Sequence, residues 1–187
     1  MRKLKLHMQI SVDGFVCGPN GELDWMTWNL DPDLKAFVVD KLTDTSDTIL
    51  LGRKMTEGFV KHWEHQVAQG SGWDRDLGVR MVNMQKVMFS RTVRQAEGKN
   101  LRVENGPLGD SVSALKRQPG KDIVVYGGAG FVSSLIEHAL IDEFNLFVNP
   151  AAIGSGMRIF GARTNLELAA SRAYPCGVVV NTYVPKR

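Results

Sequence analysis

The chain has 187 residues, of which 43% are hydrophobic and 23% are charged, and its formal net charge at pH 7 is +3. This length and composition predict one globular domain, residues 1–187. The sequence has no basic stripe interleaved with aromatic residues, no apolar run of about 20 residues and no signal-peptide pattern, which argues against nucleic acid binding, a membrane span and secretion. Its two cysteines lack motif spacing, so we expect a cytoplasmic protein without disulfides.

Hydrophobic periodicity predicts that strands and helices alternate along the chain. The first strand covers residues 3–11, with Leu4, Leu6, Met8 and Ile10 on one face. Further strands are predicted at residues 48–51, 86–89, 101–104, 123–126, 143–149, 166–173 and 178–184. Helices are predicted from residue 32, after residue 52, over residues 111–117 and over residues 131–140. This order predicts a mixed α/β sheet, mostly parallel, that ends in an antiparallel hairpin around residues 174–177.

The most informative segment is a buried strand that runs through glycines directly into a helix. The strand at 123–126 is followed by Gly127, Gly128, Ala129 and Gly130, and the apolar helix begins with Phe131 and Val132. A glycine turn leaves backbone N–H groups bare at a helix N-terminus, where the helix dipole favours an anion. The segment therefore predicts a site for the phosphates of a nucleotide.

Other nucleotide-binding motifs fit the glycine turn less well. The third glycine of a Rossmann fingerprint is replaced by Ser133, and no second strand ends in an acid at the required distance. A P-loop would need Gly-Lys-Ser/Thr at the end of the turn. A tight turn that holds no ligand stays open as an alternative.

Two other strand ends carry basic residues. Gly52, Arg53 and Lys54 follow the strand at 48–51, and Ser90 and Arg91 follow the strand at 86–89. Neighbouring strand ends of an α/β sheet form its ligand crevice, so we expect Arg53 and Arg91 to meet over a phosphomonoester. Taken alone, each arginine is equally well explained as a solvated basic residue at the end of a strand. The prediction depends on their coincidence with the glycine turn.

With these segments the chain resembles the dihydrofolate reductase superfamily, and within it the riboflavin-biosynthesis reductase (RibD C-terminal domain) type. The segments that carry the resemblance lie in the same order as in the family, at residues 11–21, 28–37, 51–54, 126–130 and 140–160. Met55 stands where the family usually carries threonine, with Thr56 one position later. The resemblance implies a three-layer dihydrofolate reductase-like fold and a homodimer.

The resemblance also implies an NADPH-dependent reductase that transfers hydride to a small heterocycle of pyrimidine or pterin type. The implied cofactor residues are Gly52, Arg53, Lys54, Ser90, Arg91, Gly127, Gly128, Ala129, Gly130, Phe131 and Val132. The loop at 13–21 would cover the nicotinamide. True folate reduction, and nucleotide binding without catalysis, are the two alternative functions.

The implied substrate contacts are Trp28, Asp33 and Phe37, with Asp33 as the catalytic acid. A carboxylate in a closed apolar pocket would have a raised pKa and could deliver a proton. Asp31 and Pro32 predict an N-cap followed by the first helical turn, which places Asp33 in that turn. An acid there is favoured by the helix dipole whatever its function, so a purely electrostatic role for Asp33 stays open.

No metal site or hydrolase is predicted. His62 and His65 are three residues apart without an evident third ligand, which is typical of a surface helix. No Gly-x-Ser-x-Gly motif occurs, and neither cysteine has a histidine nearby.

Overall fold

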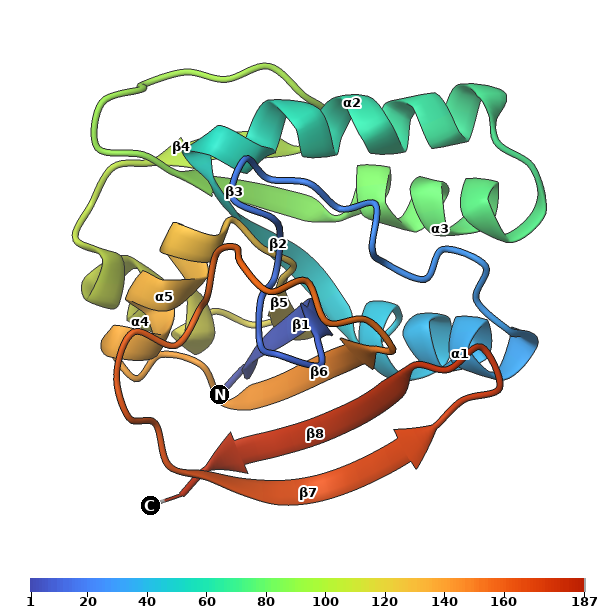
Figure 1. Ribbon diagram of the computed structural model, residues 1–187. Helices are drawn as coiled ribbons and strands as arrows, with labels where there is room; N and C mark the ends of the chain where they lie inside the picture. Colours follow the sequence, from blue (N-terminus) through green and yellow to red (C-terminus); the bar gives the residue numbers. More distant parts are fainter. Residues whose placement is uncertain (187) are drawn as a thin grey trace.

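The computed structural model describes residues 1–186, which form one sheet covered by helices on both faces (Figure 1). The sheet has eight strands in the order β4-β3-β2-β5-β1-β6-β8-β7. In chain order these are β1 Leu4–Ser11, β2 Ser46–Gly52, β3 Gln85–Phe89, β4 Leu101–Glu104, β5 Asp122–Val125, β6 Glu143–Asn149, β7 Leu166–Ala173 and β8 Val179–Pro185. The strands from β4 to β6 are parallel, and β8 and β7 add antiparallel. The predicted mixed sheet with its C-terminal hairpin is confirmed.

The helices divide between the two faces and make three layers (Figure 1). They are α1 Pro32–Phe37, the π-helix η1 Val38–Thr43, α2 Arg53–Gln69, α3 Gly72–Asn83, α4 Leu108–Arg117 and α5 Ala129–Glu137. Helices α4 and α5 bury Val112 and Leu135 against the face of β1 that carries Leu4 and Leu6. Helices α1, α2 and α3 cover the opposite face. None of the helices within residues 1–186 is long and apolar enough to cross a membrane.

The first helix begins as predicted but ends differently. Asp31 caps it, since its side chain accepts a hydrogen bond from the Leu34 amide at 3.0 Å. After six residues the α-helix gives way to η1. There the Thr43 hydroxyl donates to the Val38 carbonyl oxygen at 2.9 Å, and the Ser46 hydroxyl donates to that of Leu42 at 3.1 Å. Such side-chain donors compete with the regular backbone pattern of a helix.

The face of β1 opposite the α4–α5 layer is polar although it is covered. His7 is only 4% exposed, and its ring lies edge-on to Tyr126, with the ring centroids 5.3 Å apart. Within residues 1–186, neither ring nitrogen of His7 has a hydrogen-bond partner. Burial, with a smaller effect of the nearby Lys5 charge, lowers the pKa of His7 from 6.5 to about 3. His7 is therefore a neutral imidazole in the folded protein at pH 7.

Acid should destabilise the protein through His7. Between pH 6.5 and pH 3 the unfolded chain binds a proton at this residue and the folded protein does not. The free energy of unfolding should thus fall by roughly 1.4 kcal/mol per pH unit from this group alone. Urea unfolding of His7→Leu and wild type across this range should show a shallower pH slope for the variant. Equal slopes would contradict the assignment, and His65→Gln on the exposed side of α2 is the control.

Candidate functional site

The three segments predicted to bind the cofactor meet at the carboxyl edge of the parallel strands. Strand β2 ends at Gly52, which pairs in register with Phe89 at the end of β3. Strand β5 lies beside β2 and ends just before the glycine turn at 127–130. The strand ends thus bring together residues that are up to 78 positions apart in the sequence, from 52 to 130, as the parallel sheet predicts.

Contact between these strand ends is close enough to exclude a side chain at Gly52. A Cβ atom on Gly52 would lie 2.8 Å from the Phe131 Cβ. A Cβ atom on Gly128 would lie 4.0 Å from the Gly52 Cα, and Gly128 itself has a φ of +77°. The Phe131 ring in turn stacks on Phe89, with the centroids 5.3 Å apart. The glycines therefore let two strand ends and one helix start approach each other directly.

Two helices begin at this meeting point, and neither is capped by a side chain. Gly52 is the N-cap of α2 and Gly128 is the N-cap of α5. Neither first turn contains an acidic residue. The free backbone N–H groups and the positive ends of both helix dipoles therefore face the same edge, which suits an anion.

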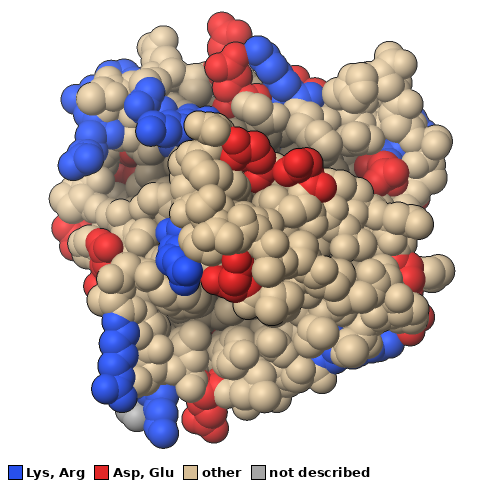
Figure 2. Space-filling view, in the orientation of Figure 1, with Lys and Arg blue, Asp and Glu red and all other residues tan. Residues whose placement is uncertain are grey.

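Exposed basic side chains surround this edge. Arg53, Lys54 and Arg91 are all exposed, and so is Arg94, which the sequence analysis did not single out. Figure 2 shows lysine and arginine gathered at the upper left, over the loop that joins β3 to β4 and the start of α2. Across residues 1–186, no carboxylate forms an ion pair with any of these four. The sequence signal for Arg94 is its place three residues after Arg91, in the same strand-end loop.

The hydroxyl groups at this edge have different roles. Ser90 is buried, and its hydroxyl oxygen accepts hydrogen bonds from the Val93 amide at 2.9 Å and the Thr92 amide at 3.3 Å. Its proton remains available to a ligand. The Thr56 hydroxyl is buried and donates to the Gly52 carbonyl oxygen at 3.1 Å. The hydroxyl after the Gly-Arg pair thus stabilises the first turn of α2, while Met55 packs against Gly127.

The loop that follows β1 is fixed to the chain that follows β6. The Asp13 carboxylate accepts hydrogen bonds from the Ser11 hydroxyl at 2.6 Å, the Gly154 amide at 2.7 Å and the Ile153 amide at 3.1 Å. These bonds, the one from Ser11 first, lower the pKa of Asp13 from 3.8 to about 2. Farther along, the Thr27 amide donates to the Asn149 side chain at 2.8 Å. The loop expected over the nicotinamide, residues 13–21, is therefore held at Asp13 to the chain that follows β6, and the segment beyond it is held at Thr27 to the end of β6.

The expected enclosure of Asp33 is wrong. Its side chain is 66% exposed and accepts a hydrogen bond from the Arg172 guanidinium of β7 at 2.7 Å. Trp28 is 68% exposed, and Phe37 is half-buried against Tyr174, with the ring centroids 6.2 Å apart. Helix α1 begins at the side of the sheet nearest the hairpin, so the three predicted substrate contacts do not form a closed apolar pocket here.

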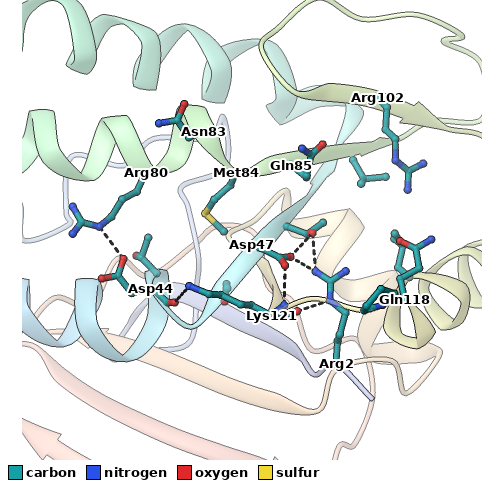
Figure 3. Close-up of a pocket in the computed structure, with 16 residues that line it drawn as sticks. Arg2, Asp44, Asp47, Arg80, Asn83, Met84, Gln85, Arg102, Gln118 and Lys121 are labelled. Carbon is teal, nitrogen blue, oxygen red and sulfur yellow. Dashed lines mark hydrogen bonds and ion pairs between the residues drawn. The ribbon is translucent and has the colours of Figure 1, made fainter.

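A hollow of about 560 Å³ opens at the opposite, amino edge of the strands (Figure 3). The cations that line it already have acidic or carbonyl partners. Arg2 pairs with Asp47, Arg80 pairs with Asp44 at 2.8 Å, and the Lys121 ammonium donates to the Asp44 carbonyl oxygen at 2.8 Å. A fourth, Arg102, pairs with Glu104 at 3.3 Å. Because its charges are balanced internally, this hollow is less suited to a polyanion than the glycine-lined edge.

Comparison with known proteins agrees with this arrangement. The family model described as the RibD C-terminal domain matches residues 2–180. The chain belongs to the RibD C-terminal domain family. The chain is also 33% identical to the uncharacterized protein YyaP of Bacillus subtilis (strain 168), over 97% of this chain and 94% of YyaP. The resemblance inferred from the sequence is thus confirmed.

Solved structures show that this RibD-type protein has the predicted dihydrofolate reductase-like fold. It superposes with a TM-score of 0.72 on a protein assigned to riboflavin biosynthesis from Shewanella sp. PV-4, at 20% identity and over 100% of both chains. It also superposes with a TM-score of 0.67 on a diaminohydroxyphosphoribosylaminopyrimidine deaminase/5-amino-6-(5-phosphoribosylamino)uracil reductase from Thermotoga maritima, at 12% identity. That match covers 99% of this chain and 57% of the Thermotoga chain.

A methyl group at Gly52 should separate the strand ends. Gly52→Ala forces the β2 end away from Phe131, and overpacking of this kind costs about 1–3 kcal/mol. Gly58→Ala, within α2 and with nothing within 4 Å of the new atom, should instead stabilise the protein by about 0.5–1 kcal/mol. Urea unfolding of both variants measures the difference. Equal effects would show that the close approach at Gly52 is not required.

Proposed function

We propose that this protein is an NADPH-dependent reductase whose substrate is a small heterocycle of pyrimidine or pterin type. The observation that carries the proposal is the meeting of two glycine-capped helix N-termini beside four exposed cations that lack carboxylate partners within residues 1–186. A dinucleotide with a third phosphate matches both features. Membership of a family of riboflavin-pathway reductases, together with the uracil reductase named for the Thermotoga relative, supports the substrate class.

Each part of the edge has a proposed role toward the cofactor. The turn at 127–130 and the Phe131 amide hold the pyrophosphate, and Val132, whose amide donates to the Gly128 carbonyl oxygen at 2.9 Å, lines the site beside them. Gly52, Arg53 and Lys54, with Ser90 and Arg91, hold the 2′-phosphate of the adenosine half, for which the arginine fork is suited. Phe131, which directly follows the turn, stacks on Phe89 and so holds the turn against the end of β3. NADPH would supply the hydride. The protein would orient the cofactor against the substrate and exclude water from the site.

The substrate side is proposed to involve Trp28, Asp33 and Phe37. In the free protein the Asp33 carboxylate is held by Arg172, whose guanidinium also lies 4.7 Å from the centre of the Tyr174 ring. The Asp33 side chain is 66% exposed at the start of α1, where a substrate can reach it. We therefore assign Asp33 to binding and orienting the substrate, and its role as the catalytic acid requires the substrate to enclose it.

The protein should prefer NADPH to NADH by at least about tenfold, because only NADPH carries the 2′-phosphate that Arg53 and Arg91 are placed to bind. Calorimetry should show that Arg53→Ala and Arg91→Ala each weaken NADPH binding about tenfold and leave NADH binding unchanged. Lys61→Ala, which removes an exposed cation farther along α2, is the control.

Equal affinity for the two cofactors in the wild type would contradict the assignment of this edge. Oxidation of NADPH with a panel of aminopyrimidines, pterins and dihydrofolate then separates the three functions. Turnover of dihydrofolate would favour folate reduction, and NADPH binding without turnover of any member would favour a nucleotide-binding protein.

We also propose a homodimer formed through β7. This strand is one of the two edge strands of the sheet, seven of its eight residues are exposed, and Leu168 is 54% exposed. An antiparallel contact of two β7 strands, centred between Ala169 and Ala170, would place Glu167 opposite Arg172 of the partner subunit. Opposite charges directly across two strands stabilise their pairing. The sequence of β7 is thus complementary to itself.

Charge reversal tests this contact. By sedimentation velocity the wild type should be a dimer, Glu167→Lys should dissociate it, and the double variant Glu167→Lys/Arg172→Glu should restore it. Glu137→Lys, on the exposed end of α5, is the control. A monomeric wild type, or a Glu167→Lys variant that remains dimeric, would contradict the proposed interface.

A further inference from the structure

His7 and Tyr126 are the one pair of adjacent buried polar groups in residues 1–186 for which the fold provides no partner. The paired residues of β1 and β5 run to Leu6 and Val125, so His7 and Tyr126 come next on neighbouring strands. Their rings lie at 76° to each other with the centroids 5.3 Å apart. Three polar atoms, the two ring nitrogens of His7 and the hydroxyl of Tyr126, are buried without a hydrogen bond.

The neighbouring polar groups are already occupied. The Asn145 side chain, next to His7 on β6, donates to Glu143 at 3.1 Å and accepts from the Thr182 hydroxyl at 2.8 Å. The Lys5 ammonium lies 2.8 Å from the Asp122 carboxylate. On η1 the Thr43 hydroxyl donates to the Val38 carbonyl oxygen and approaches Tyr126 without reaching hydrogen-bonding geometry. These neighbours thus leave the two ring nitrogens of His7 and the Tyr126 hydroxyl without partners within residues 1–186.

Both side chains are neutral and keep their donors and acceptors. Burial lowers the pKa of His7 to about 3 and raises the pKa of Tyr126 above its usual value. A neutral imidazole has one N–H donor and one nitrogen acceptor, and the phenol adds a further donor. A group that carries an N–H beside a C=O, such as the lactam edge of a pyrimidine or pterin, would satisfy this pair.

The pair also lies where a substrate should reach. Tyr126 immediately precedes the glycine turn proposed for the pyrophosphate, and Phe59 of α2 stacks on its ring at 6.1 Å. Although its hydroxyl is buried, Tyr126 as a residue is half-buried, so the pair is not sealed inside the core. The cover on this side is α1 and the π-helix η1, each six residues long. π-Helices are rare in proteins as a whole, and those that occur are often found at functional sites. A short π-helix is therefore a suitable cover to shift when the ring of a substrate enters.

We propose that His7 and Tyr126 form the inner, polar end of the substrate pocket and bind the lactam edge of the heterocycle. This inference rests on the proposed reductase function and narrows its substrate class to rings with adjacent N–H and C=O groups. It also explains why three polar atoms are buried without hydrogen-bond partners. Burying such an atom destabilises the folded protein unless a ligand supplies the missing hydrogen bond. Asp33, which is exposed, then contacts the outer part of the substrate.

Two matched heterocycles test the inference. Lumazine offers a ring lactam edge, and in 1,3-dimethyllumazine methyl groups replace the ring N–H groups. Fluorescence titration in the presence of NADPH should show that wild type binds lumazine at least about tenfold more tightly than the dimethyl compound. Tyr126→Phe and His7→Leu should each weaken lumazine binding about tenfold. Trp73→Phe, which also removes a buried polar group that has no partner within residues 1–186, should bind lumazine like wild type.

Unfolding without ligand separates a binding role from a structural one. The urea midpoint of Tyr126→Phe at pH 7 should equal or exceed that of wild type, because the variant removes a polar group that has no partner. A lower midpoint, unchanged lumazine affinity in both variants, equal binding of the two heterocycles, or no lumazine binding by wild type would each overturn the inference. NADPH affinity, measured on the same samples, should be unchanged in both variants. If wild type does not bind NADPH, the proposed cofactor is refuted. The comparison of lumazine with its dimethyl derivative still decides whether His7 and Tyr126 bind the heterocycle.

Discussion

The architecture of the site depends on the close approach of the β2 end, the β5 end and the start of α5. Gly52 and Phe131 are so near that a single Cβ atom at position 52 would lie 2.8 Å from the side chain. Because both N-caps are glycines, two helix N-termini open toward the same solvent-exposed edge, and no side chain among residues 1–186 caps either of them. The positive ends of two dipoles and a group of exposed cations are therefore concentrated at one place.

The flanking loops are fixed to this edge by buried or charged hydrogen bonds. Asp13 joins the loop after β1 to the chain after β6, and Asn149 both accepts from Thr27 and donates to Gln9 at 2.7 Å. The segment expected over the nicotinamide, residues 13–21, is thus held to the chain after β6 at Asp13 and again at Cys17, which forms a bridge with Met157. A loop held this way can cover a cofactor without the entropy loss that a free loop would suffer on ordering.

Much of this fold could be predicted from the sequence because its signals are local. The strand positions follow from runs such as 123–126, the N-cap from Asp31 and Pro32, and the hairpin from residues 174–177. The helix at 72–83 was not predicted, because it begins with glycine, contains Gly78 and has a weakly amphipathic sequence. The π-helix was not predicted either, since the hydroxyl contacts that accompany it come from its last residue, Thr43, and from Ser46 beyond its end, and are not evident in the periodicity.

The candidate site likewise has a part that could be predicted from the sequence and a part that could not. Glycines and arginines at strand ends are visible in the sequence, and the parallel sheet brings them together. The surroundings of Asp33 depend on the distant Arg172, 139 residues away, so its exposure could not be read from the first helical turn. His7 and Tyr126 belong to strands that are far apart in sequence, and each alone reads as an ordinary strand residue. Their missing hydrogen bonds become evident only in the folded protein.

The central claim is that the glycine-lined carboxyl edge, and not the hollow at the amino edge, binds NADPH. Amide chemical shifts recorded during an NADPH titration test it most directly. The amides of residues 52–54 and 127–130 should shift together and saturate at the same cofactor concentration. Saturable shifts confined to the surroundings of Arg2, Arg80 and Lys121, with none at the two helix starts, would contradict the claim.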